Sequence, residues 1–192
     1  MVHGTSAMAD FKISQLFGIP LKPNRVKIVV EVKWEPPSTG WIRINCDGSS
    51  IGSPSIGSIG FVIRDAQSNF LGAYAQNIGH ATALGAEFSS CVMAIEKALE
   101  LHLNNLWIET DSITVVKAFR QNCLIKGACL QCKFTHIHRE GNLVADSLAK
   151  NGQQLALYSS QWWEAPPLFV LSLLYRDNMN WFVLKVLISF SW

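Results

Sequence analysis

Four acidic residues stand where predicted strands end or predicted helices begin: Asp47, Glu87, Asp111 and Asp146. In α/β proteins such positions gather at the carboxyl edge of the sheet. Carboxylates held close together repel one another, which raises their pKa values unless a cation lies between them. All-oxygen ligation favours Mg²⁺ or Mn²⁺. Two such ions can activate a water molecule and stabilise the leaving oxygen of a phosphodiester.

Each of these acids also has a purely structural explanation. Asp47 precedes a glycine, as turn residues often do. Glu87 and Asp146 lie near predicted helix starts, where the helix dipole favours negative charge. Asp111 is a possible helix cap. Four acids at four element ends on one side of a sheet nevertheless favour a metal site over coincidence.

The pattern of apolar residues predicts the elements that would position these acids. Alternating apolar residues indicate strands, and apolar residues at helical spacing indicate helices. We expect strands over 42–47, 58–64, 70–78, 106–111 and 133–138, and helices over 83–105, 112–121 and 142–154, with a loop over 48–57. The order predicts an α/β fold in which a three-strand antiparallel meander joins parallel strands in a five-stranded mixed sheet flanked by helices.

This topology has a consequence for the acids. If the first and fourth strands are parallel neighbours, Asp47 and Asp111 lie side by side. The helix that crosses between the strands can then bring Glu87 to the same edge.

Length and composition indicate one domain with extensions. We predict a leader over 1–40, a domain over 41–155 and an apolar tail over 156–192. Hydrophobic residues make up 49% of the chain and charged residues 16%, which allows a large core. The net charge of +2 permits nucleic-acid binding without requiring it.

Cysteine usage favours an intracellular, reducing compartment. The chain has five cysteines, an odd number, and those at 46 and 91 fall on apolar faces. Cys129-x-x-Cys132 leaves open a metal or thiol-redox protein, but no second pair stands at zinc-like spacing. We expect neither a secretory signal nor a membrane span, and nucleus and cytoplasm remain equally open.

Several motifs together are more specific than any one acid. They are Asn45-Cys46-Asp47-Gly48-Ser49-Ser50, Ala86-Glu87, Glu109-Thr110-Asp111-Ser112 and the run from His136 to Lys150, after the lead-in Trp34-Glu35-Pro36-Pro37. In combination they resemble the ribonuclease H family. They are most similar to plant ribonuclease H-like domains found alone or at the end of non-LTR retroelement reverse transcriptases. The resemblance covers residues 32–154.

The resemblance implies a fold, a reaction and a partner. The fold is RNase H-like, and the reaction is endonucleolytic cleavage of the RNA strand of an RNA–DNA hybrid, which leaves a 3′-hydroxyl and a 5′-phosphate. Two Mg²⁺ ions, or Mn²⁺, would be held by Asp47, Glu87, Asp111 and Asp146. We expect a monomer that binds RNA–DNA hybrids or another nucleic acid.

The resemblance also implies further site residues. A catalytic histidine precedes the last aspartate in some members; His136 has the matching spacing and His138 is the neighbouring candidate. Both also fit a polar strand face. The residues expected to contact substrate, in part through the 2′-hydroxyl, are Gly48, Ser49, Ser50, Asn77 and Arg139. Loop solubility for the two serines and surface solvation for the arginine are the alternatives.

Two departures from the family pattern leave a second function open. Only about ten residues, 122–132, stand where the family has a further helix, so we expect that helix to be missing. The apolar segment 178–192 fits either sequence foreign to the family or an interfacial or partner-binding helix. The alternative function is therefore a catalytically inactive, truncated module that binds nucleic acid or protein.

Overall fold

The structure is a computed structural model, and it describes residues 12–13, 16–18, 24–122 and 131–191. The chain divides into two compact units, Val32–Val183 and the combination of Met1–Glu31 with Leu184–Trp192. Strands β1 (Asn24–Val32) and β8 (Val183–Ser191) pair as a two-stranded sheet. The segment 178–192, a candidate helix in the sequence, therefore contains a strand.

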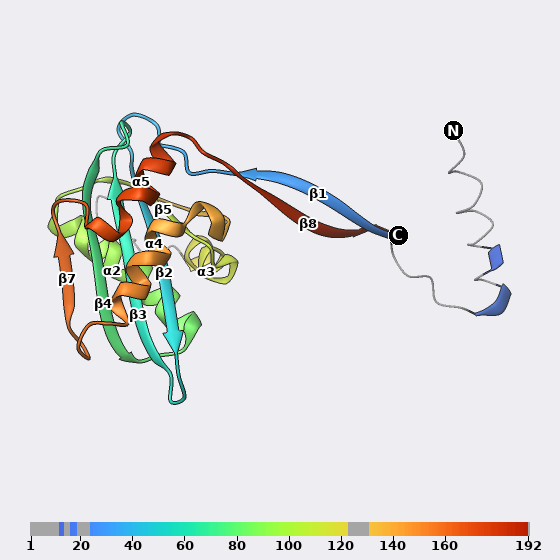
Figure 1. Ribbon diagram of the computed structural model, residues 1–192, viewed down its shortest axis with the longest axis horizontal. Coiled ribbons are helices and arrows are strands. Elements are labelled where there is room, and N and C mark those ends of the chain that lie inside the picture. Colours follow the sequence, from blue (N-terminus) through green and yellow to red (C-terminus); the bar gives the residue numbers. More distant parts are fainter. Residues whose placement is uncertain (1–11, 14–15, 19–23, 123–130, 192) are drawn as a thin grey trace. The chain divides into compact units, whose positions relative to one another are not determined.

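The unit Val32–Val183 is built on a mixed sheet (Figure 1). Its strand order is β6-β5-β2-β3-β4-β7. The strands are β2 (Ile42–Ile51), β3 (Ile56–Arg64), β4 (Phe70–His80), β5 (Asn105–Thr110), β6 (Gln131–His136) and β7 (Ser160–Trp163). Strands β2, β3 and β4 form the predicted antiparallel meander, and β5 and β6 run parallel to β2.

The sheet has six strands where the sequence predicts five. The additional strand, β7, pairs antiparallel with β4 and places Trp163 opposite Ala73. It has only four residues, too few for a clear alternation of apolar and polar positions. Strand β7 lies inside the segment predicted as an apolar tail over 156–192.

Helices cover both faces of this sheet (Figure 1). They are α2 (Ala83–Glu100), α3 (Ile113–Asn122), α4 (Leu143–Gly152) and α5 (Leu171–Asn178), with short 3₁₀ turns at Arg139–Gly141 and Leu168–Val170. Phe61 and Ile63 of β3 join the core that packs with α2 and α3. Val62, between them, joins the core with α4 and α5. Because neighbouring strand residues point to opposite faces, the two cores lie on opposite sides of the sheet.

The predicted loop over 48–57 is largely strand. Strand β2 continues through Asp47 to Ile51, and Gly48 pairs with Ile59 of β3. A Cβ atom at Gly48 would clash with the backbone of Ala86 and Glu87. Glycine at this position therefore lets α2 approach the strand closely. Gly48, read as a loop residue in the sequence, is therefore a packing residue of the strand.

A row of alternating cations and tryptophans crosses the face of the sheet opposite α2 and α3. The Nζ of Lys133 lies 3.4 Å from the ring centroid of Trp107, and the guanidinium carbon of Arg43 lies 3.7 Å from the same centroid. The guanidinium carbon of Arg64 lies 3.6 Å from the ring centroid of Trp34. Arg43 and Arg64 are buried, and such contacts stabilise charges that have left water, whereas Lys133 is exposed.

Hydrogen bonds and ion pairs complete this network. The Asn45 amide oxygen accepts from the Trp34 indole at 2.8 Å and from Arg64 at 2.9 Å. Arg64 and Asp177 of α5 form an ion pair at 2.8 Å, with side chains 1% and 3% exposed. Trp34 and α5 therefore belong to the core of this unit, although the sequence placed both outside the 41–155 domain.

Three further expectations concern the shortened segment after α3, the cysteines and membrane-spanning helices. The shortened segment after α3 falls on residues 123–130, which lie outside the described residues, as does Cys129 of the proposed Cys129/Cys132 pair. The described cysteines, Cys46, Cys91 and Cys132, are free thiols. None of the helices in the described residues has the length and apolar character needed to cross a membrane.

Candidate active site

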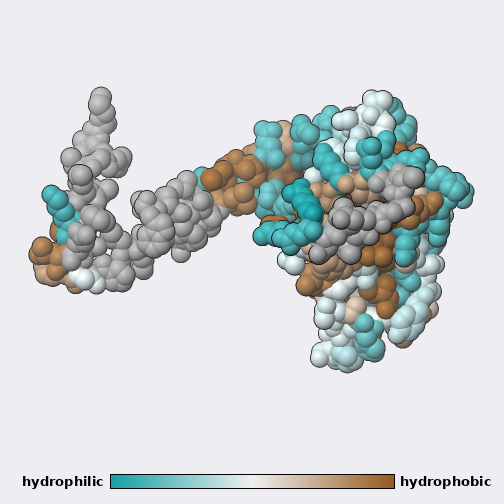
Figure 2. All heavy atoms as spheres, turned by 180° about the vertical axis from the view of Figure 1, so that it is seen from behind, coloured by the Kyte–Doolittle hydropathy of each residue, from teal (hydrophilic) through white to brown (hydrophobic). Residues whose placement is uncertain are grey.

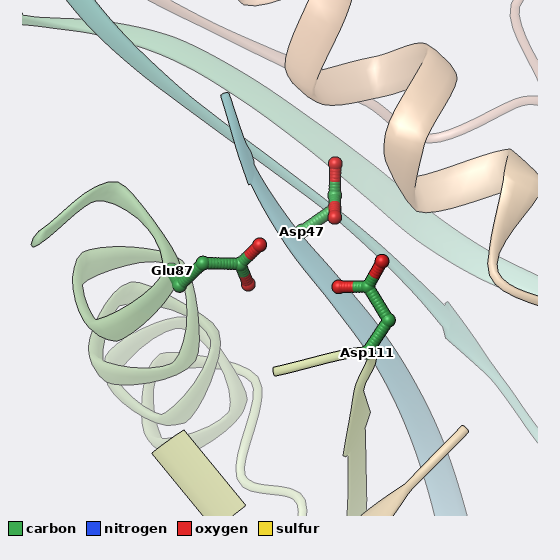
Figure 3. A group of neighbouring side chains, drawn as sticks. All are labelled: Asp47, Glu87 and Asp111. Carbon is green, nitrogen blue, oxygen red and sulfur yellow. The ribbon is translucent and has the colours of Figure 1, made fainter. Parts of the chain in front are cut away.

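Three of the predicted acids meet at one edge of the sheet. The parallel register of β2 and β5 pairs Asn45 with Glu109, so two residues further on Asp47 comes level with Asp111. Glu87 reaches the same place from the second turn of α2 (Figure 3). One carboxylate oxygen from each of Asp47, Glu87 and Asp111 lies within 4.8 Å of the others. The predicted juxtaposition is therefore present.

Asp47 bears the largest electrostatic strain of the three. Burial, followed by the charges of Glu87, Asp111 and Asp146, raises the pKa of Asp47 to about 9. A carboxyl group with such a pKa is protonated at neutral pH unless positive charge is brought to it. The site thus has the electrostatic character of a cation-binding site.

Glu87 is held by two donors that favour its charged form. Burial, followed by the charge of Asp111, raises the pKa of Glu87 to about 7. Hydrogen bonds from the Thr110 hydroxyl, at 3.0 Å, and from the Gly48 backbone act in the opposite direction. Burial also raises the pKa of Asp111, which the nearby charge of Arg139 lowers in part.

The fourth predicted acid, Asp146, lies beside this group, but its carboxylate forms ion pairs with two basic side chains. Its carboxylate accepts from Arg139 at 2.6 Å and from Lys150 at 2.5 Å. It lies outside the trio whose oxygens are all within 4.8 Å. Its charge still raises the pKa of Asp47 and Asp111, which places it beside them.

His136, the predicted catalytic histidine, ends β6 near this group. Its charge lowers the pKa of Asp111, so the two side chains are close enough to interact. Its ring meets that of His138 edge to face, with centroids 5.2 Å apart. The choice between the two histidines as a proton carrier stays a prediction.

Comparison with known proteins identifies this arrangement. The profile of the reverse transcriptase-like family matches residues 45–152, more than half of the chain and all four acids. The chain belongs to this family. It carries an RNase H-like domain, as the resemblance predicted.

One curated relative and three solved structures are similar to the RNase H-like domain. An Arabidopsis thaliana protein provisionally named a ribonuclease H protein is 29% identical over 140 residues, which is 66% of this chain but only 23% of that protein. RNase H1 of Halobacterium salinarum is 21% identical, with a TM-score of 0.53, over 60% of this chain and 99% of that one.

The other two structures share the same core. The RNase H domain of a Mycobacterium tuberculosis protein is 23% identical, with a TM-score of 0.53, over 59% of this chain and 94% of that one. LC11-RNase H1, solved in complex with an RNA/DNA hybrid, is 25% identical, with a TM-score of 0.50, over 57% of this chain and 94% of that one. The likenesses below 25% identity show the fold alone.

The residues predicted to contact substrate are spread along the RNase H-like domain. Gly48 serves the packing of α2, and the Ser49 carbonyl accepts from Gln153 at 3.3 Å. The Ser50 hydroxyl donates to the Ala81 carbonyl at 2.9 Å. Arg139 remains 63% exposed beside the acids, where an anionic substrate would meet it. Substrate contact by these residues stays a prediction.

Asn77, another residue predicted to contact substrate, has a buried side chain. Its amide nitrogen donates to the Leu155 carbonyl at 3.1 Å, and its amide oxygen accepts from the Gly79 nitrogen at 3.0 Å. The bond to Leu155 joins β4 to the segment after α4, and the bond from Gly79 lies within β4. They give Asn77 a structural role, and its contact with substrate stays a prediction.

Two residues that the sequence interpretation passed over support the acids. Thr110 holds Glu87, and its oxygen also accepts from the Ser112 nitrogen at 3.2 Å. Asn142 donates to the Cys46 carbonyl at 2.9 Å and so ties the start of α4 to the strand that carries Asp47. Both residues lie within the motifs quoted above. Thr110 directly precedes Asp111, and Asn142 lies four residues before Asp146. This proximity to the acids is the sequence signal that could have identified them.

If this domain cleaves RNA–DNA hybrids, as proposed below, Thr110→Val should lower that cleavage about 10-fold to 100-fold, because Glu87 loses a donor that fixes and charges its carboxylate. The pH–rate profile should shift to higher pH, since the pKa of Glu87 rises when the hydrogen bond is removed. Thr110→Ser keeps the hydroxyl and should restore both the rate and the profile. Equal rates for Thr110→Val and the native chain would contradict this role.

Proposed function

We propose that this domain is a divalent-metal-dependent endoribonuclease that cleaves the RNA strand of RNA–DNA hybrids. The observation that carries the proposal is the group of three carboxylates within 4.8 Å of one another, two of them with strongly raised pKa values. The similar LC11-RNase H1 was solved with an RNA/DNA hybrid, which supports the choice of substrate. The chain spans about a quarter of its curated relative, so the proposal concerns this domain alone.

The side chains present fit the proposed metal. Asp47, Glu87 and Asp111 offer only oxygen ligands, which favour Mg²⁺, with Mn²⁺ as the alternative. In the proposal Asp146 completes the site by exchanging its bonds to Arg139 and Lys150 for the metal. Two bound ions would supply charge neutralisation, an activated water and stabilisation of the leaving oxygen.

The remaining roles fall to groups near the acids. Exposed Arg139 binds a substrate phosphate, since guanidinium groups match phosphate oxygens in geometry and charge. His136, next to Asp111, carries a proton to or from the reacting phosphate. We also propose that the protein acts in a reducing intracellular compartment, in keeping with the free thiols of Cys46, Cys91 and Cys132.

One observation favours the second candidate function, a non-catalytic nucleic-acid-binding module. The Asp146 carboxylate is paired with Arg139 and Lys150 at 2.6 and 2.5 Å and stands apart from the trio. If these pairs persist when metal is added, the site lacks its fourth ligand. Binding without cleavage would then be the function.

Strand-specific labelling distinguishes the two candidates. The full chain is incubated with Mg²⁺ and a hybrid labelled separately on the RNA and the DNA strand, with RNA duplex and DNA duplex of the same sequence as controls. The enzyme should cut only the RNA strand of the hybrid and leave 5′-phosphate ends. Tight binding of the hybrid with both strands intact would instead support the binding module.

A further inference from the structure

A row of hydrogen-bonded polar side chains crosses the sheet just before two of the acids. Residues two apart on a strand point to the same face, so Asn45 shares the face of Asp47, and Glu109 shares that of Asp111. The Asn45 amide nitrogen donates to the Glu109 carboxylate at 3.1 Å, and both side chains are buried. Arg43, at 3.5 Å, neutralises that carboxylate. The row therefore joins β2 to β5 about 7 Å before the acids.

The backbone pairing of these two strands ends at the same place. The parallel register of β2 and β5 runs as far as the pair Asn45–Glu109. Strand β2 continues beside β3 beyond this pair, whereas β5 ends one residue later, at Thr110. Among the described residues, no later pair of this register joins Asp47 to Asp111. The side-chain bond therefore fixes the spacing of the strands at the point from which both acids project.

The neighbours of Asn45 leave its amide group one orientation. Its oxygen accepts from the Trp34 indole at 2.8 Å and from Arg64 at 2.9 Å, so its nitrogen faces Glu109. The other carboxylate oxygen of Glu109 accepts from the hydroxyl of Thr135, on β6, at 3.0 Å. A buried polar network with its partners in place is rigid. The row can therefore hold β2 and β5 in one relative position.

The opposite face of the same strands is held differently. Ile44 of β2, Ile108 of β5 and Phe134 of β6 belong to the core that packs with α2 and α3. Figure 2 shows hydrophobic side chains that also reach the surface on this side of the RNase H-like domain. Apolar contacts are non-directional, whereas hydrogen bonds require defined distances and angles. The polar row is therefore better suited than the apolar core to set the spacing of the acids.

We propose that Asn45 and Glu109 are positioning residues that hold Asp47 and Asp111 at the spacing a divalent cation requires. They act through the two strands, because the bond between them lies at the end of the shared backbone pairing. This role rests on the proposed function, since it assumes that the acids bind the metal. It gives the pair an effect on metal affinity beyond the stability that a buried hydrogen bond provides.

Exchanging the donor and the acceptor provides a test with an internal rescue. Titration calorimetry gives the Mg²⁺ dissociation constant of the full native chain, Asn45→Asp and the double variant Asn45→Asp/Glu109→Gln. Asn45→Asp keeps an acceptor for Trp34 and Arg64 but sets two carboxylates against each other, and it should weaken Mg²⁺ binding about 10-fold. The added negative charge alone would strengthen the binding of a cation, so weaker binding reports displaced acids.

The double variant restores one donor and one acceptor without changing the net charge. Its Mg²⁺ dissociation constant should return to within about threefold of the native value. If Asn45→Asp does not fold, Asn45→Ser takes its place, because the shorter side chain also gives up the bond to Glu109. It should weaken Mg²⁺ binding in the same direction.

Trp107→Phe is the matched control. It removes the bond from the Trp107 indole to the Thr135 hydroxyl, 2.5 Å long, at the outer end of the same row. It keeps an aromatic ring for Arg43 and Lys133. This variant should lower the thermal midpoint of the metal-free protein, as Asn45→Asp does, yet leave the Mg²⁺ dissociation constant within about twofold of the native value.

Three results would overturn the positioning role. They are Mg²⁺ binding by the folded single variant that is unchanged or tighter, a double variant that binds no better than the single one, and an equal loss of affinity in the control. Hybrid cleavage is measured in parallel. A native chain that binds Mg²⁺ without cleaving the hybrid would refute the proposed function alone, and the dissociation constants would still decide the positioning role. A native chain that binds neither Mg²⁺ nor Mn²⁺ would overturn both.

Discussion

Asp47→Asn is expected to stabilise the metal-free protein, although most changes to buried polar residues destabilise. Burial and the neighbouring carboxylates raise the pKa of Asp47 from 3.8 when unfolded to about 9 in the fold. The unfolded chain therefore loses this proton near pH 4, while the folded chain keeps it until about pH 9. Above pH 4 the free energy of unfolding of the native chain falls as pH rises. Asparagine has no proton to lose and removes this penalty.

Denaturant titrations in EDTA at several pH values measure this effect. The variant should gain roughly 2 kcal/mol over the native chain at pH 7.5, and the difference should vanish near pH 4. Asp65→Asn is the matched control. Hydrogen bonds from Asn69 and Gln67 outweigh the slight burial and lower the pKa of Asp65, so its replacement should act in the opposite direction. A variant less stable than the native chain at pH 7.5 would contradict the electrostatic account.

Added Mg²⁺ should reverse the order of stability. A cation that binds only the folded site raises stability by mass action, so the native chain should gain in thermal midpoint as Mg²⁺ is added. Asp47→Asn, with one ligand fewer, should gain much less. An equal gain in both proteins would place the metal elsewhere.

Asp177→Asn is expected to be strongly destabilising. It leaves the Arg64 guanidinium, which is 1% exposed, without its carboxylate partner at 2.8 Å. Breaking a buried ion pair from one side costs about 3–5 kcal/mol. Burial already lowers the pKa of Arg64 to about 10, with Asp177 acting against that shift. The thermal midpoint should fall by about 10 °C.

The exposed pair of Lys97 and Glu100, at 2.7 Å, is the control for this variant. Glu100→Gln removes a carboxylate from an ion pair in the same way, but solvent screens that pair. It should shift the midpoint by less than about 2 °C. If the two variants behaved alike, α5 would not be part of the folded core.

The parts of the site that the sequence predicted depend on local pattern and strand order. Alternation of apolar residues identified the strands that carry Asp47 and Asp111, and helical spacing identified the helix that carries Glu87. Parallel pairing of β2 with β5 then fixed their juxtaposition. Because this pairing follows from the topology, the trio could be predicted without any side-chain detail.

The parts that the sequence missed depend on contacts between distant segments. The stacking of Trp34 with Arg64, and the ion pair of Arg64 with Asp177, join residues far apart in the chain. No periodicity signals such contacts. The predicted domain over 41–155 therefore leaves out Trp34 and α5, which lie near the two ends of the folded unit. Gly48 was assigned to a loop for a related reason, since its close packing against α2 is visible only once the helix is in place.

The central claim is that the acidic group is the catalytic centre for hybrid cleavage. Asp111→Asn tests it most directly, because Asp111 belongs to the trio yet is only half-buried, so the variant should fold. The measurement is the rate of RNA-strand cleavage in a labelled hybrid, with Mg²⁺ and with EDTA, at equal folded concentrations of native and variant protein. The account predicts cleavage by the native chain in Mg²⁺ alone, and at least a 1,000-fold lower rate for the variant. Cleavage in EDTA, or by the variant at the native rate, would contradict it.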